Sequence, residues 1–313
     1  MPISSPPDQT RPWFDNDPRP RKTMTRSRPA PRFFVAALVL AIAWLSMRPL
    51  SAQTVDIQGP PTRALLVELF TSEGCSSCPP AEKWLNALKD RDDLWQRVVP
   101  IALHVDYWDY IGWPDRFATS KNSLRQRTYR KDGLSRGVYT PGLFVGGREW
   151  RGWFRNRELD LAEAGKRIGS IRIKARDGHF EASFEALSPA VIQAPALDLH
   201  IARIGFDLET SILAGENRGR TLHHDFVSLG RSVHRLVRTD DAGDIFWRAR
   251  GALPEAIVSA EREGIVAWVS PAGELPPIQA AGGLFDIEGN KEIADRGDAL
   301  DSPTPRLRTF PGL

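Results

Sequence analysis

The spacing of apolar residues in the first half of the chain predicts a strand, a helix and a second strand. Residues 65–70 are an apolar run with one charge, which has the length of a buried strand. Residues 79–88 follow as a helix, because a proline pair at its start lacks only donors that a first helical turn leaves unpaired anyway. Its apolar residues recur at i, i+3, i+4 and i+7: Ala81, Trp84, Leu85 and Leu88. A second apolar run at residues 98–106 completes a β-α-β unit, which predicts parallel pairing of the two strands.

The same reasoning predicts the other elements of a first domain over residues 63–169. Residues 115–130 have a helical pattern, and we expect the basic residues there, Arg125 among them, on a solvated face. Pro141 opens a short apolar strand that ends in a Gly-Gly pair, which is a hairpin signal. A closing helix is predicted over residues 157–168.

From Ser170 the pattern changes to an alternation of apolar and polar residues, which predicts β-strands. Two alternating segments flank an Asp177-Gly178 turn, as in a hairpin. Further strands are predicted near residues 197–204, 221–238, 245–250, 265–269 and 281–287. Short strands with turn signals predict an antiparallel β-sandwich over residues 170–289, followed by a loose polar tail at residues 290–313. The predicted fold class is therefore an α/β domain with a C-terminal antiparallel β-sandwich-like domain.

The first 52 residues have the composition of a leader. Residues 1–31 are rich in Pro, Arg, Asp and Ser, and we expect them to be disordered. Residues 32–52 contain an apolar run at 33–47, with basic residues before it and a small residue after it, as in a secretory signal. An uncleaved anchor that tethers the chain to a membrane through this run is the alternative, although a membrane span needs roughly 20 residues. Met24 suits the start of such a signal better than Met1. We expect a periplasmic or secreted protein or, with the anchor, one held in the inner membrane and facing the periplasm.

The distribution of charge argues against nucleic acid as a partner. The whole chain has a net charge of +3, from 42 Lys+Arg and 39 Asp+Glu. Residues 1–52 hold eight Lys/Arg and three Asp/Glu, a net charge of +5, which leaves −2 for the remainder. Since the basic charge belongs to the leader, it does not indicate nucleic-acid binding.

The only two cysteines, Cys75 and Cys78, stand where the first strand turns into the helix. The unpaired N–H groups and partial positive charge of a helix N-terminus stabilise a thiolate, and a Cys-x-x-Cys pair there commonly has a first thiol of lowered pKa. This favours Cys75 as the nucleophile and Cys78 as the resolving thiol of a thiol–disulfide exchange. A static disulfide, or half of a metal site, is the alternative. In an oxidising compartment the pair is either a stable disulfide or part of a relay.

Acidic and aromatic side chains are expected around the cysteine pair. Glu73 and Glu82 flank it, where a carboxylate can raise a thiol pKa or relay a proton; capping or solvation of the helix is the other explanation. Tyr107 and Trp108 follow the second strand, and ligands of an open α/β sheet lie outside the carboxyl ends of its strands. We therefore expect both aromatic residues to bind substrate, although a cluster that only packs a loop would have the same composition.

Several segments together resemble a known family: residues 68–82, 104–113, 125–129, 138–141 and 215–220. The set is similar to a family of secreted bacterial thioredoxin-like proteins catalogued as a domain of unknown function. The Cys-x-x-Cys turn followed by Thr140-Pro141 also resembles the thioredoxin superfamily, in which a cis-proline lies against the cysteine turn. The resemblance implies a thioredoxin-like first domain, a cis Pro141, and a backbone edge at Thr140 that can hydrogen-bond an extended substrate. The chain departs from thioredoxin itself in its Cys-Ser-Ser-Cys turn and in an extra helix before Pro141.

These observations define three candidate functions. The first is an exported thiol–disulfide oxidoreductase that acts on protein thiols or disulfides without a cofactor. The second is a module for copper or another soft metal, with Cys75, Cys78 and His104 as ligands. The third is a non-catalytic secreted binding protein, in which the β-rich domain recognises the partner and the disulfide is static. The first is the prediction that the cysteine pair favours.

Overall fold

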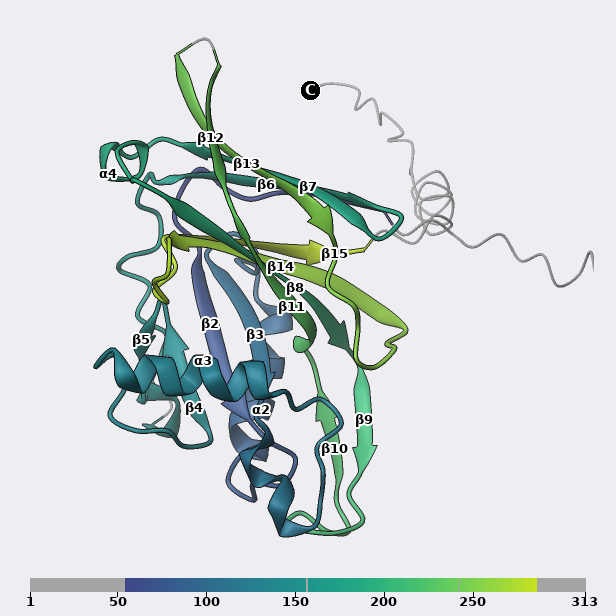
Figure 1. Cartoon of the computed structure of the whole chain (residues 1–313). Helices are drawn as coiled ribbons and strands as arrows, with labels where there is room; N and C mark the ends of the chain where they lie inside the picture. The colour runs from purple at the N-terminus through teal and green to yellow at the C-terminus, as the bar shows by residue number, and fades with distance from the viewer. Residues whose placement is uncertain (1–53, 156, 242, 286–313) are drawn as a thin grey trace, which may run out of the picture. The chain divides into compact units, whose positions relative to one another are not determined.

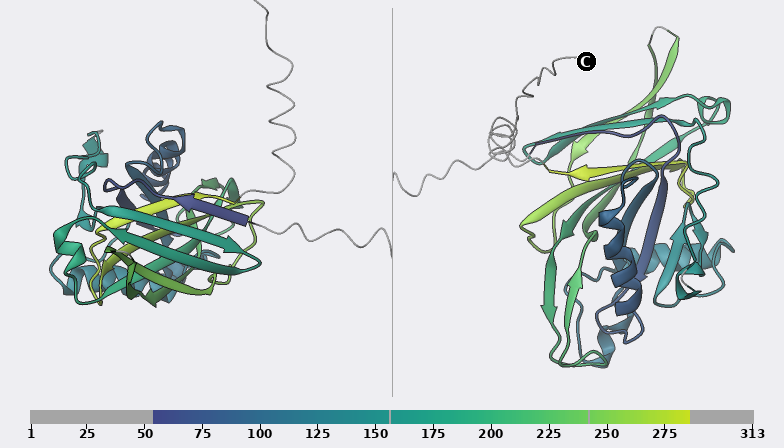
Figure 2. Two further views of the ribbon diagram at one scale, coloured as in Figure 1. Left: turned by 90° about the horizontal axis from the view of Figure 1, so that it is seen from above. Right: turned by 180° about the vertical axis from the view of Figure 1, so that it is seen from behind.

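Two fully buried strands form the centre of the first half of the fold. In the computed structural model, which describes residues 54–155, 157–241 and 243–285, β2 (Leu65–Thr71) pairs in parallel with β3 (Val98–His104), as predicted. α2 (Pro79–Asn86) connects them and packs on one face, while α3 (Ser120–Lys131) packs on the other (Figures 1 and 2). Because both faces are covered, the two strands are continuous apolar runs rather than alternating ones.

An eight-stranded mixed sheet extends from these two strands into the second half of the chain. The other members are β4 (Gly142–Val145), β5 (Arg148–Glu149), β8 (Leu197–Phe206), β11 (Val227–Arg235), β14 (Arg262–Pro271) and β15 (Gln279–Leu284). Their order is β15-β14-β8-β11-β3-β2-β4-β5. The two halves join where β11 lies parallel to β3, with Val227 opposite Ala102. At this junction the N–H of Ala102 donates to the carbonyl of Phe226 at 2.9 Å.

A five-stranded antiparallel sheet packs against the larger sheet (Figure 2). In order, its members are β1 (Thr54–Gln58), β6 (Gly169–Arg176), β7 (His179–Ala186), β13 (Asp244–Ala252) and β12 (Val237–Asp241). The predicted β6–β7 hairpin is confirmed, with Asp177 and Gly178 at positive φ in its turn. Its apolar residues, such as Ile171 and Ile173, meet Leu199 of β8 in a shared core. One face of this sheet is buried and the other is exposed, which is why its strands alternate.

The remaining elements are short. They are β9 (Leu208–Ser211), β10 (Thr221–His224), α4 (Pro189–Ile192) and the 3₁₀ helices η1 (Ala87–Asp90), η2 (Asp106–Ile111) and η3 (Gly152–Arg155). The β9–β10 ribbon projects from the large sheet beside α2 (Figure 1). The helix predicted from residue 115 begins only at Ser120. Thr119 is its N-cap, and the Thr119 side chain accepts a hydrogen bond from the N–H of Asn122. The closing helix predicted over residues 157–168 is wrong, because these residues form a turn at 162–165 and an isolated β-bridge at Arg167 and are otherwise irregular.

The predicted fold class is also wrong. The described residues are mostly β-sheet, about 44% strand against 17% helix, and not an α/β thioredoxin-like domain followed by a separate sandwich. β8, β11, β14 and β15 continue the sheet of β2 and β3, so one sheet crosses the boundary expected near residue 169. The physical reason is that the edge of β3 hydrogen-bonds to β11, and hydrophobic periodicity does not specify which strand occupies an edge. The predicted leader, signal segment and tail lie outside the described residues. Within the described ranges no helix has the length and hydrophobicity of a membrane span.

Candidate functional site

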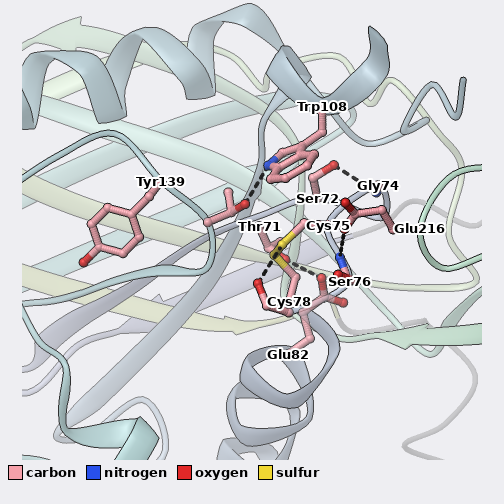
Figure 3. Close-up of a disulfide and its surroundings, with 12 residues drawn as sticks. Thr71, Ser72, Gly74, Cys75, Ser76, Cys78, Glu82, Trp108, Tyr139 and Glu216 are labelled. Carbon is pink, nitrogen blue, oxygen red and sulfur yellow. Dashed lines mark hydrogen bonds between the residues drawn. A yellow bond between two sulfur atoms is a disulfide. The ribbon is translucent and has the colours of Figure 1, made fainter. Parts of the chain in front are cut away.

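The cysteine pair lies in the turn between β2 and α2, as the sequence predicts. Cys75 and Cys78 are joined in a disulfide, with their Cα atoms 5.4 Å apart (Figure 3). The carbonyl of Cys78 accepts from the N–H of Ala81 at 2.9 Å and from that of Glu82 at 3.1 Å, so α2 starts directly behind the second sulfur. Both cysteines are buried, with exposed fractions of 1% and 0%, although Ser76 and Ser77 between them are exposed. The disulfide therefore lies just beneath the surface.

The residues expected to bind substrate gather beside this turn. The Thr140–Pro141 bond is cis, as the resemblance implied, and the next residue, Gly142, pairs with Phe70 near the end of β2. Trp108 donates from Nε1 to Oγ1 of Thr140 at 2.7 Å, which places its ring above the disulfide in Figure 3. Gly74 permits this closeness, since a Cβ there would lie 3.2 Å from Cβ of Trp108. Trp108, Thr140 and Pro141 thus form one wall of the site.

Tyr107 points into the neighbouring helix instead. Its hydroxyl donates to Oε1 of Gln126, on α3, at 2.9 Å. Burial raises the pKa of Tyr107 to about 12, so the phenol stays protonated. Tyr107 therefore anchors η2 to α3 and supports the position of Trp108.

The loop between β9 and β10 covers the other side of the cysteine turn. Asn217 is completely buried and donates from its side-chain amide to the carbonyls of Glu73 at 2.8 Å and Cys75 at 3.0 Å. Glu216 accepts from the N–H of Ser76 at 3.0 Å (Figure 3). In the sequence, residues 215–220 contribute only to the family resemblance, so the role of Asn217 as a clamp is visible only in the fold.

A buried cluster of carboxylates and histidines lies behind the disulfide. His224 approaches Oε2 of Glu82 with Nδ1 at 2.6 Å and Oε1 of Glu73 with Nε2 at 3.3 Å. His104 contacts Asp115 through Nδ1 at 2.7 Å, and its ring centroid is 5.3 Å from that of His224. The hydroxyl of Thr71 donates to Glu82. The two carboxylates predicted to flank the cysteines, Glu73 and Glu82, therefore meet at one histidine.

Opposite charges dominate the electrostatics of this cluster. Burial by itself would lower the pKa of His224, but the neighbouring Glu82 and Glu73 raise it to about 10. Burial would likewise raise the pKa of Glu82, yet the charge of His224 and its hydrogen bond hold it below its ordinary value. The pKa of His104 is raised, because the Asp115 carboxylate outweighs the effect of burial.

Sequence reasoning found some members of this cluster and missed others. Glu73, Glu82 and His104 were candidates, the last only as a ligand of the alternative metal site with the two cysteines, and His104 faces Asp115 and His224. The adjacent histidines of β10 point to opposite faces, as expected for a strand: His223 is exposed and His224 is buried. His224 was missed because it lies 142 residues from Glu82 along the chain, and no local pattern links them.

Comparisons with known proteins identify a family and two structures of low similarity. The sequence profile of the family described as "Protein of unknown function (DUF1223)" matches residues 66–270. A crystal structure of a protein from Agrobacterium tumefaciens is 21% identical, with a TM-score of 0.47, and the match covers 72% of this chain and 94% of that one. HBP35 of Porphyromonas gingivalis is 17% identical, with a TM-score of 0.46, and the match covers 81% of each chain. Among curated proteins no sequence matches the chain.

Proposed function

The chain belongs to the DUF1223 family of proteins of unknown function, and we propose that it is an exported thiol–disulfide oxidoreductase that uses Cys75 and Cys78. The observation that carries the proposal is the disulfide at the start of α2, with the cis Thr140–Pro141 bond and Trp108 beside it. This site is similar to that of the thioredoxin superfamily, whereas the sheet around it is different. Export is inferred from the signal-like composition of residues 32–52.

The exchange proceeds through a mixed disulfide. A thiolate of a substrate dithiol attacks Sγ of Cys75, the Cys75–Cys78 bond breaks, and its electron pair stays on Sγ of Cys78. The second substrate thiolate then attacks the substrate sulfur of the mixed disulfide and releases Cys75 as a thiolate. The substrate leaves as a disulfide, and the two protons of its thiols end on Cys75 and Cys78. The reverse sequence reduces a substrate disulfide, with Cys75 as nucleophile and Cys78 as resolving thiol.

Cys75 is the sulfur that a substrate reaches first. Its Sγ accepts a hydrogen bond from the exposed Ser77 hydroxyl at 3.3 Å, so this sulfur lies directly beside a surface side chain. Cys78 lies deeper, at the first turn of α2 and completely buried. Movement of the Ser76–Ser77 turn, which Glu216 and Asn217 hold in place, would open the route to Cys75.

The wall opposite this turn suits an extended polypeptide. Thr140 precedes β4 and lies outside that strand's pairing with β2 and β5, and a peptide segment can add to such a free backbone segment through main-chain hydrogen bonds. Trp108 offers an apolar contact above the disulfide. Protein thiols or disulfides in extended segments are therefore the proposed substrates.

A trapping experiment tests the proposal. We expect reduced wild-type protein to reduce insulin, Cys75→Ser to lose this activity completely, and Cys78→Ser to accumulate a mixed disulfide through Cys75. Ser76→Ala is the matched control within the same turn and should keep the activity. A folded wild-type protein whose Cys75–Cys78 bond exchanges with no dithiol reagent would contradict the proposal and favour a static disulfide.

A further inference from the structure

Three buried side chains from distant parts of the chain converge behind the cysteine turn. Glu82 comes from α2, His104 from the end of β3 and His224 from the end of β10, with exposed fractions of 4%, 1% and 2%. Each offers one ligand atom, and these atoms lie within 4.8 Å of one another. We propose that Glu82, His104 and His224 bind one divalent transition-metal ion of the Zn²⁺ class. The three residues are called the metal cluster below.

One ring nitrogen of the cluster has no hydrogen-bond partner. Nε2 of His104 is buried and has none among the described residues, whereas Nε2 of His224 and Oε1 of Glu73 face each other at 3.3 Å. Buried polar atoms are almost always paired, so the unpaired nitrogen of His104 requires a physical explanation. A cation held by the metal cluster would use the lone pair of this nitrogen.

The surroundings orient His104 as a ligand. A carboxylate can only accept, so the 2.7 Å contact with Asp115 makes Nδ1 of His104 the donor and leaves Nε2 with a free lone pair in the neutral ring. Asp115 is itself fixed, because it accepts from the N–H groups of Glu73 and Phe117, each at 2.9 Å. A carboxylate behind a histidine is the usual outer support of a metal-bound imidazole.

Glu82 is oriented in a similar way. The Thr71 hydroxyl donates to its Oε1 and Nδ1 of His224 approaches its Oε2, so neither oxygen is free to rotate towards solvent. Glu73 lies on the other side of His224, 3.3 Å from Nε2, and can supply a further carboxylate oxygen. The cluster is therefore held from three elements and does not depend on a flexible loop.

The ligand types indicate the kind of ion. Two imidazoles and one carboxylate suit Zn²⁺ or Fe²⁺, whereas Ca²⁺ and Mg²⁺ prefer oxygen ligands alone. Neither sulfur belongs to the set, so the metal cluster differs from the Cys75–Cys78–His104 site considered from the sequence. The inference also stands without the proposed redox function, since it uses neither cysteine.

Metal analysis of the purified full chain tests the site. After loading with Zn²⁺ and removal of free ion, we expect one Zn²⁺ per chain in the wild type and at least about a tenfold loss of affinity in Glu82→Gln and His224→Gln. The matched control is His223→Ala, which alters the exposed neighbour on the same strand and should keep the ion. A wild type without stoichiometric Zn²⁺, or an equal loss in His223→Ala, would overturn the inference.

Two further measurements keep the test independent of folding and of the redox proposal. If the cluster variants do not fold, the absorption spectrum of the wild type with added Co²⁺ tests the ligand set. Visible d–d bands without a sulfur charge-transfer band would support nitrogen and oxygen ligands. A sulfur charge-transfer band, or the absence of d–d bands, would contradict them. A double variant, Cys75→Ser with Cys78→Ser, should lose insulin reduction but keep one Zn²⁺. Loss of the ion in that variant would instead assign it to the cysteines.

Discussion

Two buried charged clusters occupy the same eight-stranded sheet, and they differ in how completely they are paired. In the first, Glu68 of β2 accepts from Nε of Arg125 and from the Tyr129 hydroxyl, each at 2.6 Å. Both of its carboxylate oxygens are thus bonded. In the metal cluster, Nε2 of His104 is buried without a partner among the described residues, and Nε2 of His224 has only the 3.3 Å contact with Glu73. We call the Glu68–Arg125–Tyr129 group the closed cluster.

The difference separates a structural role from a functional one. A buried ion pair is tolerated when its geometry is good and further hydrogen bonds satisfy its charged groups. In the closed cluster, between β2 and α3, both oxygens of Glu68 accept hydrogen bonds, and Nε and Nη2 of Arg125 both donate. The closed cluster also corrects the expectation of a solvated basic face for Arg125, which is only 4% exposed, whereas the basic residues Lys121, Arg127 and Arg130 of α3 are exposed as predicted. A cluster left incomplete in the same protein is more simply explained by a ligand than by a packing need.

Breaking the closed cluster should give the largest loss of stability. Arg125→Met leaves the Glu68 carboxylate buried with half of its bonding, and we expect the free energy of unfolding to fall by about 3–5 kcal/mol in urea denaturation. The control is Arg127→Met, an exposed position on the same helix. Similar losses in the two variants would mean that the ion pair does not stabilise the fold.

Removing the ion from the metal cluster should give the next largest effect. With Zn²⁺ at about 100 times its dissociation constant, binding to the folded state adds about 2.7 kcal/mol, which a chelator should abolish. Urea denaturation with and without chelator measures this difference. In Glu82→Gln the chelator should not change the free energy of unfolding. If the chelator does not change it in the wild type either, the metal cluster binds no stabilising ion and the contrast with the closed cluster is lost.

Loosening the β9–β10 loop over the cysteine turn should lower the stability less, but it should raise the rate at which the disulfide is reduced. Asn217→Ala removes two hydrogen bonds to buried carbonyls, at a cost of about 2 kcal/mol. We expect dithiothreitol to reduce the Cys75–Cys78 bond several-fold faster, since the turn can then move. Arg218→Ala, an exposed neighbour, should leave the rate unchanged. An unchanged rate in Asn217→Ala would show that this loop does not limit access.

The smallest expected effect contrasts two histidines. His224, among carboxylates, has a raised pKa, whereas burial and the charges of Arg125 and Arg231 lower the pKa of His200 well below its ordinary value. His200 thus stays neutral in the folded state, while the unfolded chain binds a proton below about pH 6.5. Stability should therefore fall with falling pH, with a slope that approaches about 1.4 kcal/mol per pH unit from this group.

The measurement is urea denaturation of the wild type and of His200→Gln between pH 7.5 and pH 5. The variant lacks the titrating ring, so the wild type should lose stability relative to it as the pH falls. Parallel curves would show that His200 gains a proton in the folded state as well.

Much of the local structure could be predicted from the sequence. β2, α2 and β3 follow from apolar spacing, and the β6–β7 hairpin follows from alternation around Asp177-Gly178. Each of these patterns is set by side chains a few residues apart, which is the range over which periodicity carries information. The cis bond before Pro141 came from resemblance and not from spacing.

The sequence by itself determined the cysteine turn: a Cys-x-x-Cys pair between an apolar strand and a proline-led helix is a local arrangement. Only the tertiary structure decided that β11 extends the sheet at β3 and that His224 and Asn217 reach the back and side of that turn. These contacts join residues more than a hundred positions apart, and they arise from edge pairing and burial of whole elements. A pattern of neighbouring residues cannot predict such contacts, because the free energy that favours them arises only when whole elements are buried together in the core.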